Sequence, residues 1–261
     1  MQEEWNSKIF MKKIMFVIVL SILYANIFAY ELNINENVRF GFPSKNGIIL
    51  YKKGFVLLYD KNKKVPLWVS YHLKKEYLQK KFKPLYSFMP DPQLKKGERA
   101  EIEDYNKTIY ARCRLSPPED MSRDKEVMKD SYYLSNVCPM DKELYNNCWK
   151  KLENMIRDFV KDGNDVWIVT GPLFTQKQQF IKKIGKNKIF VPTYFYKVIL
   201  FQRQDRSFGA AAYIFENKKC RKITGNNVVS IDEVEKIANL DFFNLLPEYI
   251  QNLVESKKNP L

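Results

Sequence analysis

Two arginines that alternate along one strand are the first side chains in this sequence that could act on a charged substrate. Arg112 and Arg114 close a β-type run over residues 104–114. Because side chains two residues apart on a strand point to the same side, both guanidinium groups face one surface. Paired guanidinium groups bind phosphate oxygens, so the spacing indicates a phosphate-binding surface. A pair of salt-bridged surface arginines is the alternative.

The segments around these arginines predict the order strand, loop, strand, helix. Ser116-Pro117-Pro118 ends the first strand, because proline removes a backbone donor. Residues 119–129 form the loop, residues 131–137 are predicted as the second strand, and Pro139 breaks that strand. A helix begins near Asp141. Its apolar side chains recur at spacings of three and four, as on one buried helix face: Leu144, Cys148, Trp149, Leu152 and Ile156.

Further elements are expected on both sides of this unit. Strands are predicted at residues 54–59, 67–71, 166–170, 189–202 and 209–216, from their β-branched and aromatic content. Two C-terminal helices are predicted at residues 230–238 and 239–249. Ser230 is a suitable N-cap for the first helix, with Glu233 three residues on.

This ordered set resembles the DNA/RNA non-specific endonuclease family, the ββα-metal nucleases, over about residues 40–220. The matches are Leu115-Ser116-Pro117, Tyr133-Leu134-Ser135-Asn136, Pro139, Leu144, Trp149, Leu152 and Glu153, flanked by matches at residues 90–94, 169–173 and 191–198. The resemblance implies an α+β, ββα-metal nuclease fold with a central, mostly antiparallel sheet flanked by helices. It also implies metal-dependent hydrolysis of DNA or RNA.

The residues that carry catalysis in that family are mostly replaced in this chain. The position of the general-base histidine is Arg114, and the position of the metal-binding asparagine is Tyr145. Of the set, only Arg112 and Glu153 remain. A guanidinium stays protonated and cannot accept a proton from water. A phenol is a poor replacement for an amide oxygen on a hard metal ion.

The sequence therefore predicts a nucleic-acid-binding family member whose metal-dependent phosphodiester hydrolysis is lost or strongly impaired, and its status as an enzyme stays open. Further departures from the family pattern, at Met140 and near Tyr86, support this prediction. The implied cofactor is Mg²⁺ or another divalent metal, with no cofactor as the alternative. Two other functions stay open: an active sugar-non-specific endonuclease with a rearranged metal site, and a non-catalytic protein-interaction module.

Glu153 and Asn146 are the side chains that could compensate for the lost metal ligand at Tyr145. Glu153 follows Tyr145 by eight residues, slightly more than two helical turns, so the two share a helix face. We expect Glu153 to form a salt bridge with Arg112 or Arg114. Asn146 is rotated by about 100° from Tyr145, so it could bind a metal only if the helix contained a local bulge.

Composition and the start of the chain add expectations about partners and location. The 261 residues carry a formal net charge of +14, which favours nucleic acid as partner; an evenly solvated, lysine-rich surface is the alternative. Residues 1–29 are predicted as an extension and signal peptide, and residues 30–261 as one nuclease-like domain. We expect export to the periplasm or the outside, without stable membrane association. A membrane anchor at Met11–Ala29 is the alternative. No oligomeric state follows from the sequence.

The cysteines and the one histidine add little chemistry. Cys113, Cys138, Cys148 and Cys220 suggest disulfides in an exported protein and allow three pairings; buried free thiols are the alternative. The ten-residue separation of Cys138 from Cys148 favours that pair. A zinc site is not expected, because the chain has no Cys-x-x-Cys motif and a single histidine. We expect that histidine, His72, to be structural.

Overall fold

The computed structural model describes residues 35–79, 82 and 87–261. Two expectations lie outside the described residues: the signal peptide or anchor at Met11–Ala29, and the departure from the family pattern near Tyr86. Within the described part of the chain, no helix is long and apolar enough to span a membrane.

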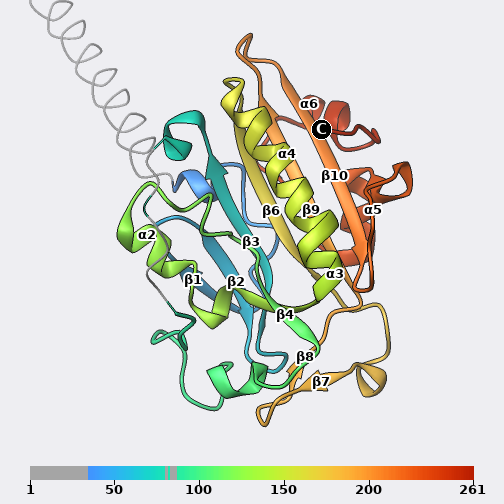
Figure 1. Cartoon of the computed structure of the whole chain (residues 1–261). Coiled ribbons are helices and arrows are strands. Elements are labelled where there is room, and N and C mark those ends of the chain that lie inside the picture. Colours follow the sequence, from blue (N-terminus) through green and yellow to red (C-terminus); the bar gives the residue numbers. More distant parts are fainter. Residues whose placement is uncertain (1–34, 80–81, 83–86) are drawn as a thin grey trace, which may run out of the picture.

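A seven-stranded sheet in which all neighbouring strands are antiparallel forms the centre of the fold (Figure 1). Its strands, in spatial order, are β1 (Ile48–Tyr51), β2 (Val56–Asp60), β3 (Val65–Leu73), β6 (Asp165–Leu173), β9 (Tyr194–Gln202), β10 (Phe208–Glu216) and β11 (Val228–Val229). Two small antiparallel sheets pair β4 (Tyr110–Arg114) with β5 (Val137–Asp141), and β7 (Lys183–Ile184) with β8 (Ile189–Phe190).

Helices cover both faces of the large sheet, each above its own apolar cluster. On one face lies α4 (Lys150–Lys161), above a cluster that includes Leu152, Ile156, Phe195 and Ile199 (Figure 1). On the other face lie α5 (Ile231–Ala238) and α6 (Glu248–Val254), above a cluster that includes Trp68, Val198, Ile231 and Val254. Strand side chains alternate between these two clusters, as the pleat requires. The predicted α+β fold, with an antiparallel sheet flanked by helices, is confirmed.

The remaining helical segments are short. They are α2 (Lys125–Asp130), α3 (Lys142–Leu144), a π-helix (Tyr145–Trp149) that joins α3 to α4, and the 3₁₀ turns η1 (Glu36–Val38), η2 (Lys75–Leu78), η3 (Ile102–Tyr105), η4 (Leu134–Asn136), η6 (Gln178–Phe180) and η7 (Gly225–Asn227).

The small sheet of β4 and β5 differs from the predicted strand pair. β4 begins only at Tyr110, and β5 begins at Val137 and runs through Pro139. The Leu115 N–H donates to the Asn136 carbonyl at 3.0 Å, so Leu115 and Asn136 form a hydrogen-bonded pair. Hydrogen-bonded and non-hydrogen-bonded pairs alternate along an antiparallel ladder, which makes Arg112–Pro139, three pairs further along, a non-hydrogen-bonded pair. The proline nitrogen therefore faces away from β4, where its missing proton costs no ladder bond.

The disulfide joins Cys148 to Cys220, so the favoured pairing of Cys138 with Cys148 is wrong. Cys138 lies directly opposite Cys113 in the β4–β5 ladder, and both are buried free thiols. Cys148 instead lies on the π-helix, and its bond ties that helix to the loop that follows β10.

The first predicted C-terminal helix is confirmed, and the second begins later than expected. The Glu233 N–H donates to Ser230 Oγ at 3.1 Å, and the Ser230 N–H donates to the Glu233 carboxylate at 2.9 Å, which closes the expected capping box. Asn239 ends α5 in the left-handed conformation, with φ of 53°. Phe243 also has φ of 53°, so residues 239–243 cannot continue a helix, and α6 starts only after Pro247.

Candidate functional site

Arg112 and Arg114 project from the same side of β4, as predicted, and both lie over the ring of Phe88. Their guanidinium carbons are 5.4 Å and 5.1 Å from its centroid. Arg112 also lies 5.8 Å from the Tyr105 ring, and Arg114 lies 4.8 Å from the Tyr132 ring. We call these five residues the arginine face. Within the described part of the chain, neither arginine has a carboxylate at ion-pair distance, which disfavours the salt-bridge alternative.

The two positions where the family has its base and its metal ligand lie next to each other. Tyr145 is half-buried at the start of the π-helix, close enough to Arg114 for the charge of that side chain to act on its hydroxyl. Burial raises the pKa of Tyr145 to about 12, with Arg114 opposing the rise. The Lys150 ammonium lies 4.7 Å from the centroid of the Tyr145 ring. The phenol is therefore neutral at physiological pH, and cations surround it.

The helix does contain the local bulge that Asn146 would need, but the bulge does not bring an asparagine into the site. In a π-helix one extra residue is accommodated per turn. Asn146 is nevertheless exposed, and its side-chain oxygen accepts from the Lys150 ammonium at 3.2 Å. Asn147 is also exposed and donates to the Cys220 carbonyl at 3.2 Å. The side chains of both asparagines next to Tyr145 are therefore hydrogen-bonded at the protein surface.

Glu153 faces the sheet interior, and the expected salt bridge to Arg112 or Arg114 is not formed. The Glu153 residue is only 5% exposed, and Lys197 of β9 is the cation with the largest electrostatic effect on its carboxylate. Burial raises the pKa of Glu153 to about 7, with Lys197 opposing and Asp120 adding to the rise. The reason for the difference is geometric, because α4 turns Glu153 toward β9 while Arg112 and Arg114 point away from the β4 inner face that carries Cys113.

Lys197 is a site residue that the sequence analysis missed. It is fully buried, and its ammonium lies 4.6 Å from the centroid of the Trp149 ring. Burial lowers its pKa, and Glu153 opposes that change. The signal was present in the sequence, because Lys197 interrupts the apolar run of β9 and lysine is rarely buried unless paired. Among the described residues, neither Lys197 Nζ nor Glu153 Oε1 has a hydrogen-bond partner.

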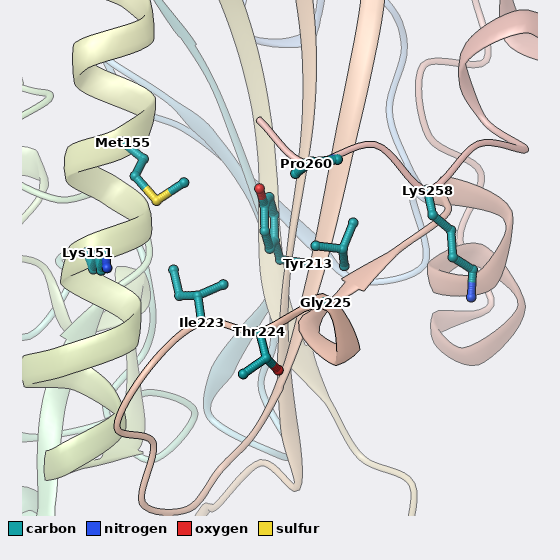
Figure 2. Close-up of a pocket in the computed structure, with 9 residues that line it drawn as sticks. Lys151, Met155, Tyr213, Ile223, Thr224, Gly225, Lys258 and Pro260 are labelled. Carbon is teal, nitrogen blue, oxygen red and sulfur yellow. The ribbon is translucent and has the colours of Figure 1, made fainter.

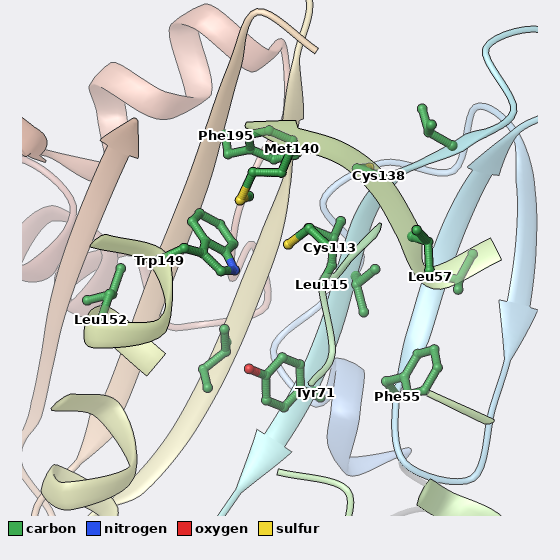
Figure 3. Packing of buried hydrophobic residues seen from close by; sticks show 14 of the residues in the cluster. Phe55, Leu57, Tyr71, Cys113, Leu115, Cys138, Met140, Trp149, Leu152 and Phe195 are labelled. Carbon is green, nitrogen blue, oxygen red and sulfur yellow. The ribbon is translucent and has the colours of Figure 1, made fainter. Parts of the chain in front are cut away.

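A buried ion pair, also missed from the sequence, lies beside Glu153. Arg157 of α4 donates to Asp120 at 2.8 Å, and the Tyr71 hydroxyl donates to the other Asp120 oxygen at 3.0 Å. Burial raises the pKa of Asp120 against the opposing effect of Arg157. Figure 3 shows the Tyr71 hydroxyl, the Cys113 sulfur and the Trp149 indole nitrogen directed toward one region of this interior.

These residues do not fit a divalent metal site of the kind the resemblance implies. The ligand position holds Tyr145, a neutral phenol with the cationic side chains of Arg114 and Lys150 nearby. The remaining carboxylate, Glu153, is buried and already has the cation Lys197 in its surroundings. Within the described part of the chain, a group of three acidic side chains close enough to share an ion occurs elsewhere, at Asp232, Glu235 and Glu255.

Two other features lie apart from the arginine face. His72 is buried on the opposite side of the sheet, stacked 4.6 Å from Trp167, and burial lowers its pKa to about 3. This placement agrees with a structural role. A cavity of about 590 Å³ lies between α4 and the segment after Cys220, with Met155, Tyr213 and Ile223 in its lining (Figure 2). Its lining includes neither arginine of the face.

Residues 33–249 match the profile of the family described as DNA/RNA non-specific endonuclease. The chain belongs to that family. It is 31% identical over 220 residues to the mitochondrial nuclease EXOG of Danio rerio, a match that covers 80% of this chain and 64% of the relative. It is 28% identical to the mitochondrial nuclease of Saccharomyces cerevisiae, covering 85% of this chain and 74% of the relative. The family assignment made from the motifs is confirmed.

The chain also resembles a solved structure of the same family. The match is to a crystal structure of the EndoG/EndoGI complex, described as showing the mechanism of EndoG inhibition, with a TM-score of 0.75 and 26% identity. It covers 81% of this chain and 91% of that chain. The chain spans only about two thirds of the length of the Danio rerio relative.

The expectation of export is contradicted by these relatives. The nucleases from Danio rerio, Schizosaccharomyces pombe and Saccharomyces cerevisiae are all named as mitochondrial. A positive start followed by an apolar run is therefore not sufficient in this family to predict secretion.

Proposed function

We propose that this endonuclease-family chain binds nucleic acid on its arginine face and that its metal-dependent phosphodiester hydrolysis is lost or strongly impaired. We also propose a mitochondrial location, by analogy with the relatives. The single observation that carries the proposal is the placement of Arg114 next to Tyr145, because these two side chains occupy the base and metal-ligand positions. Neither group can accept a proton from water near neutral pH.

Binding is supported by the geometry of the arginine face. Arg112 makes one side-chain hydrogen bond, to Asn106 at 3.2 Å, and Arg114 Nε has no partner among the described residues. Both guanidinium groups are half-buried against aromatic rings, which orients them without neutralising their charge. Such donors bind phosphate oxygens and carry no base preference of their own.

Replacing both arginines by alanine is expected to weaken binding of DNA and RNA oligonucleotides by roughly tenfold per arginine, the effect of one lost charged hydrogen bond. The slope of log K against log salt should fall by about 0.7–0.9 for each lost phosphate contact. Fluorescence anisotropy between 50 mM and 200 mM salt measures both quantities.

Arg203→Ala is the matched control, because Arg203 is an exposed arginine in the β9–β10 hairpin, at the end of the sheet away from β4 (Figure 1). It should leave both the affinity and the salt slope nearly unchanged. If the unmodified chain binds neither DNA nor RNA at low salt, the nucleic-acid proposal is wrong and a protein-interaction role takes its place.

A further inference from the structure

A stripe of exposed apolar side chains follows the outer surface of the C-terminal layer. Leu245 is 68% exposed, Tyr249 is 73% exposed and Leu253 is 52% exposed. Each is four residues from the next, and Tyr249 and Leu253 therefore share one face of α6. Val254 lies on the other side of α6, which is buried against the sheet. Single exposed apolar residues are ordinary, but a row of three marks an interaction surface.

The C-terminal segment that carries this stripe has a formal charge opposite in sign to that of the rest of the chain. Residues 231–261 contain six carboxylates and three lysines, a formal charge of −3. The other 230 residues therefore carry a formal charge of +17, and the two parts together give the total of +14. One of the three lysines, Lys258, is paired with Glu233 at 2.7 Å. Glu248, next to Tyr249, is exposed and makes no ion pair among the described residues.

The layer is also separated from the nucleic-acid site by the sheet. α5 and α6 pack on the cluster that includes Trp68 and Val198, whereas the inner face of β4 packs through Cys113 on the opposite cluster (Figure 1). A ligand on the stripe would therefore leave the arginine face open.

We propose that the stripe of Leu245, Tyr249 and Leu253 docks a basic, amphipathic segment of a partner protein. Apolar side chains of that segment cover the stripe, and its lysines or arginines face the carboxylates of the C-terminal layer. Charge of this sign repels nucleic acid and anionic lipid, and it would oppose a symmetric dimer in which two such layers meet. The partner and the nucleic acid bind on opposite faces, so the chain can hold both at once.

The test uses the full chain and a fluorescent 16-residue probe peptide of leucine and lysine, arranged to form an amphipathic helix. Saturable binding is expected by anisotropy, because the stripe offers the peptide apolar area beside the exposed carboxylate of Glu248. The same peptide with glutamate in place of lysine should not bind.

Two variants and a matched control locate the binding. Tyr249→Ser combined with Leu253→Ser should weaken binding of the lysine peptide by about tenfold or more, as expected when central apolar anchors of an interface are removed. Glu248→Lys should weaken it several-fold, and more so at low salt. Ile237→Ser removes an equally exposed apolar side chain, 51% exposed, from α5. Ile237 lies two residues after Glu235, about 200° around the helix from the side that faces Glu255, so this control should bind normally.

Several results would overturn the proposal. One is unchanged affinity of the Tyr249–Leu253 double variant for the lysine peptide. Another is a loss of affinity in Ile237→Ser as large as that in the double variant. A third is binding of the glutamate peptide. Capture of anionic vesicles through the stripe would assign it to a lipid surface. Self-association in sedimentation that disappears in the double variant would assign it to a second copy of the chain. Circular dichroism of each variant confirms that the fold is retained.

Discussion

Supercoiled plasmid is expected to stay intact when incubated with the purified chain in Mg²⁺ or Mn²⁺, with a result no different from that in EDTA. Loss of the general base alone removes about 10²–10⁴-fold in rate. Without a fitted metal ion, several further kcal/mol of transition-state stabilisation are also missing. Arg114 can still hold a phosphate, but it holds ground and transition states nearly alike, which does not accelerate the reaction.

The same assay separates the two missing groups. Arg114→His should restore no cleavage, because the helix still presents Tyr145 at the ligand position. Tyr145→Asn should also stay inactive, because no base is restored. The double variant is the smallest change that replaces both groups. The related Saccharomyces cerevisiae mitochondrial nuclease is the positive control. EDTA-sensitive nicking by the unmodified chain would show that a different metal site operates on this fold.

Arg157→Met is expected to lower the free energy of unfolding by about 3–5 kcal/mol, the usual cost of breaking a buried ion pair by removing one partner. The variant keeps the aliphatic packing of the side chain but leaves the Asp120 carboxylate with the Tyr71 hydroxyl as its remaining donor among the described residues. The matched control is Lys161→Met on the same helix, because the Lys161–Asp158 pair is exposed. That control should stay within about 1 kcal/mol of the unmodified chain.

The loss in Arg157→Met should also depend on pH. Burial raises the pKa of Asp120 in the folded chain, and Arg157 is the largest effect that opposes the rise. Without Arg157 the folded-state pKa rises further above the unfolded-state value. A carboxyl of this kind costs stability as the pH rises from the unfolded pKa through the folded pKa. Urea unfolding should therefore show a larger deficit at pH 8 than at pH 5. An equal deficit at both values would show that Asp120 is not the affected group.

Periodicity is enough to predict most of the long strands and the helix that contains α4, because these depend on local patterns. The motifs are enough to predict the family, and the family resemblance implies the antiparallel sheet. The β5 strand was placed wrongly because the effect of Pro139 depends on which pair of the ladder it occupies, and that is set by its partner strand. The second C-terminal helix was placed wrongly because Phe243 adopts a left-handed conformation that its residue type does not favour.

Within the site, the sequence is enough to identify the replaced base and metal ligand, at Arg114 and Tyr145. It does not reveal the side chains that surround the retained Glu153. Arg112 and Arg114 were placed on one face by strand alternation alone. The environment of Glu153 could not be predicted, because Lys197, Asp120 and Arg157 come from a distant strand, a loop and the next turn of α4. The pairing of Cys148 with Cys220 likewise joins residues 72 apart, which spacing does not reveal.

Calorimetric titration of Mn²⁺ into the full chain tests the central claim most directly, because it measures the metal site without requiring turnover. The titration is made on the Asp232→Asn, Glu255→Gln variant, so that the surface carboxylate group does not contribute. We expect no saturable binding, and no change when Glu153→Gln is added. One equivalent of bound Mn²⁺ that disappears with Glu153→Gln would contradict the account, because it would show that the site still holds its metal.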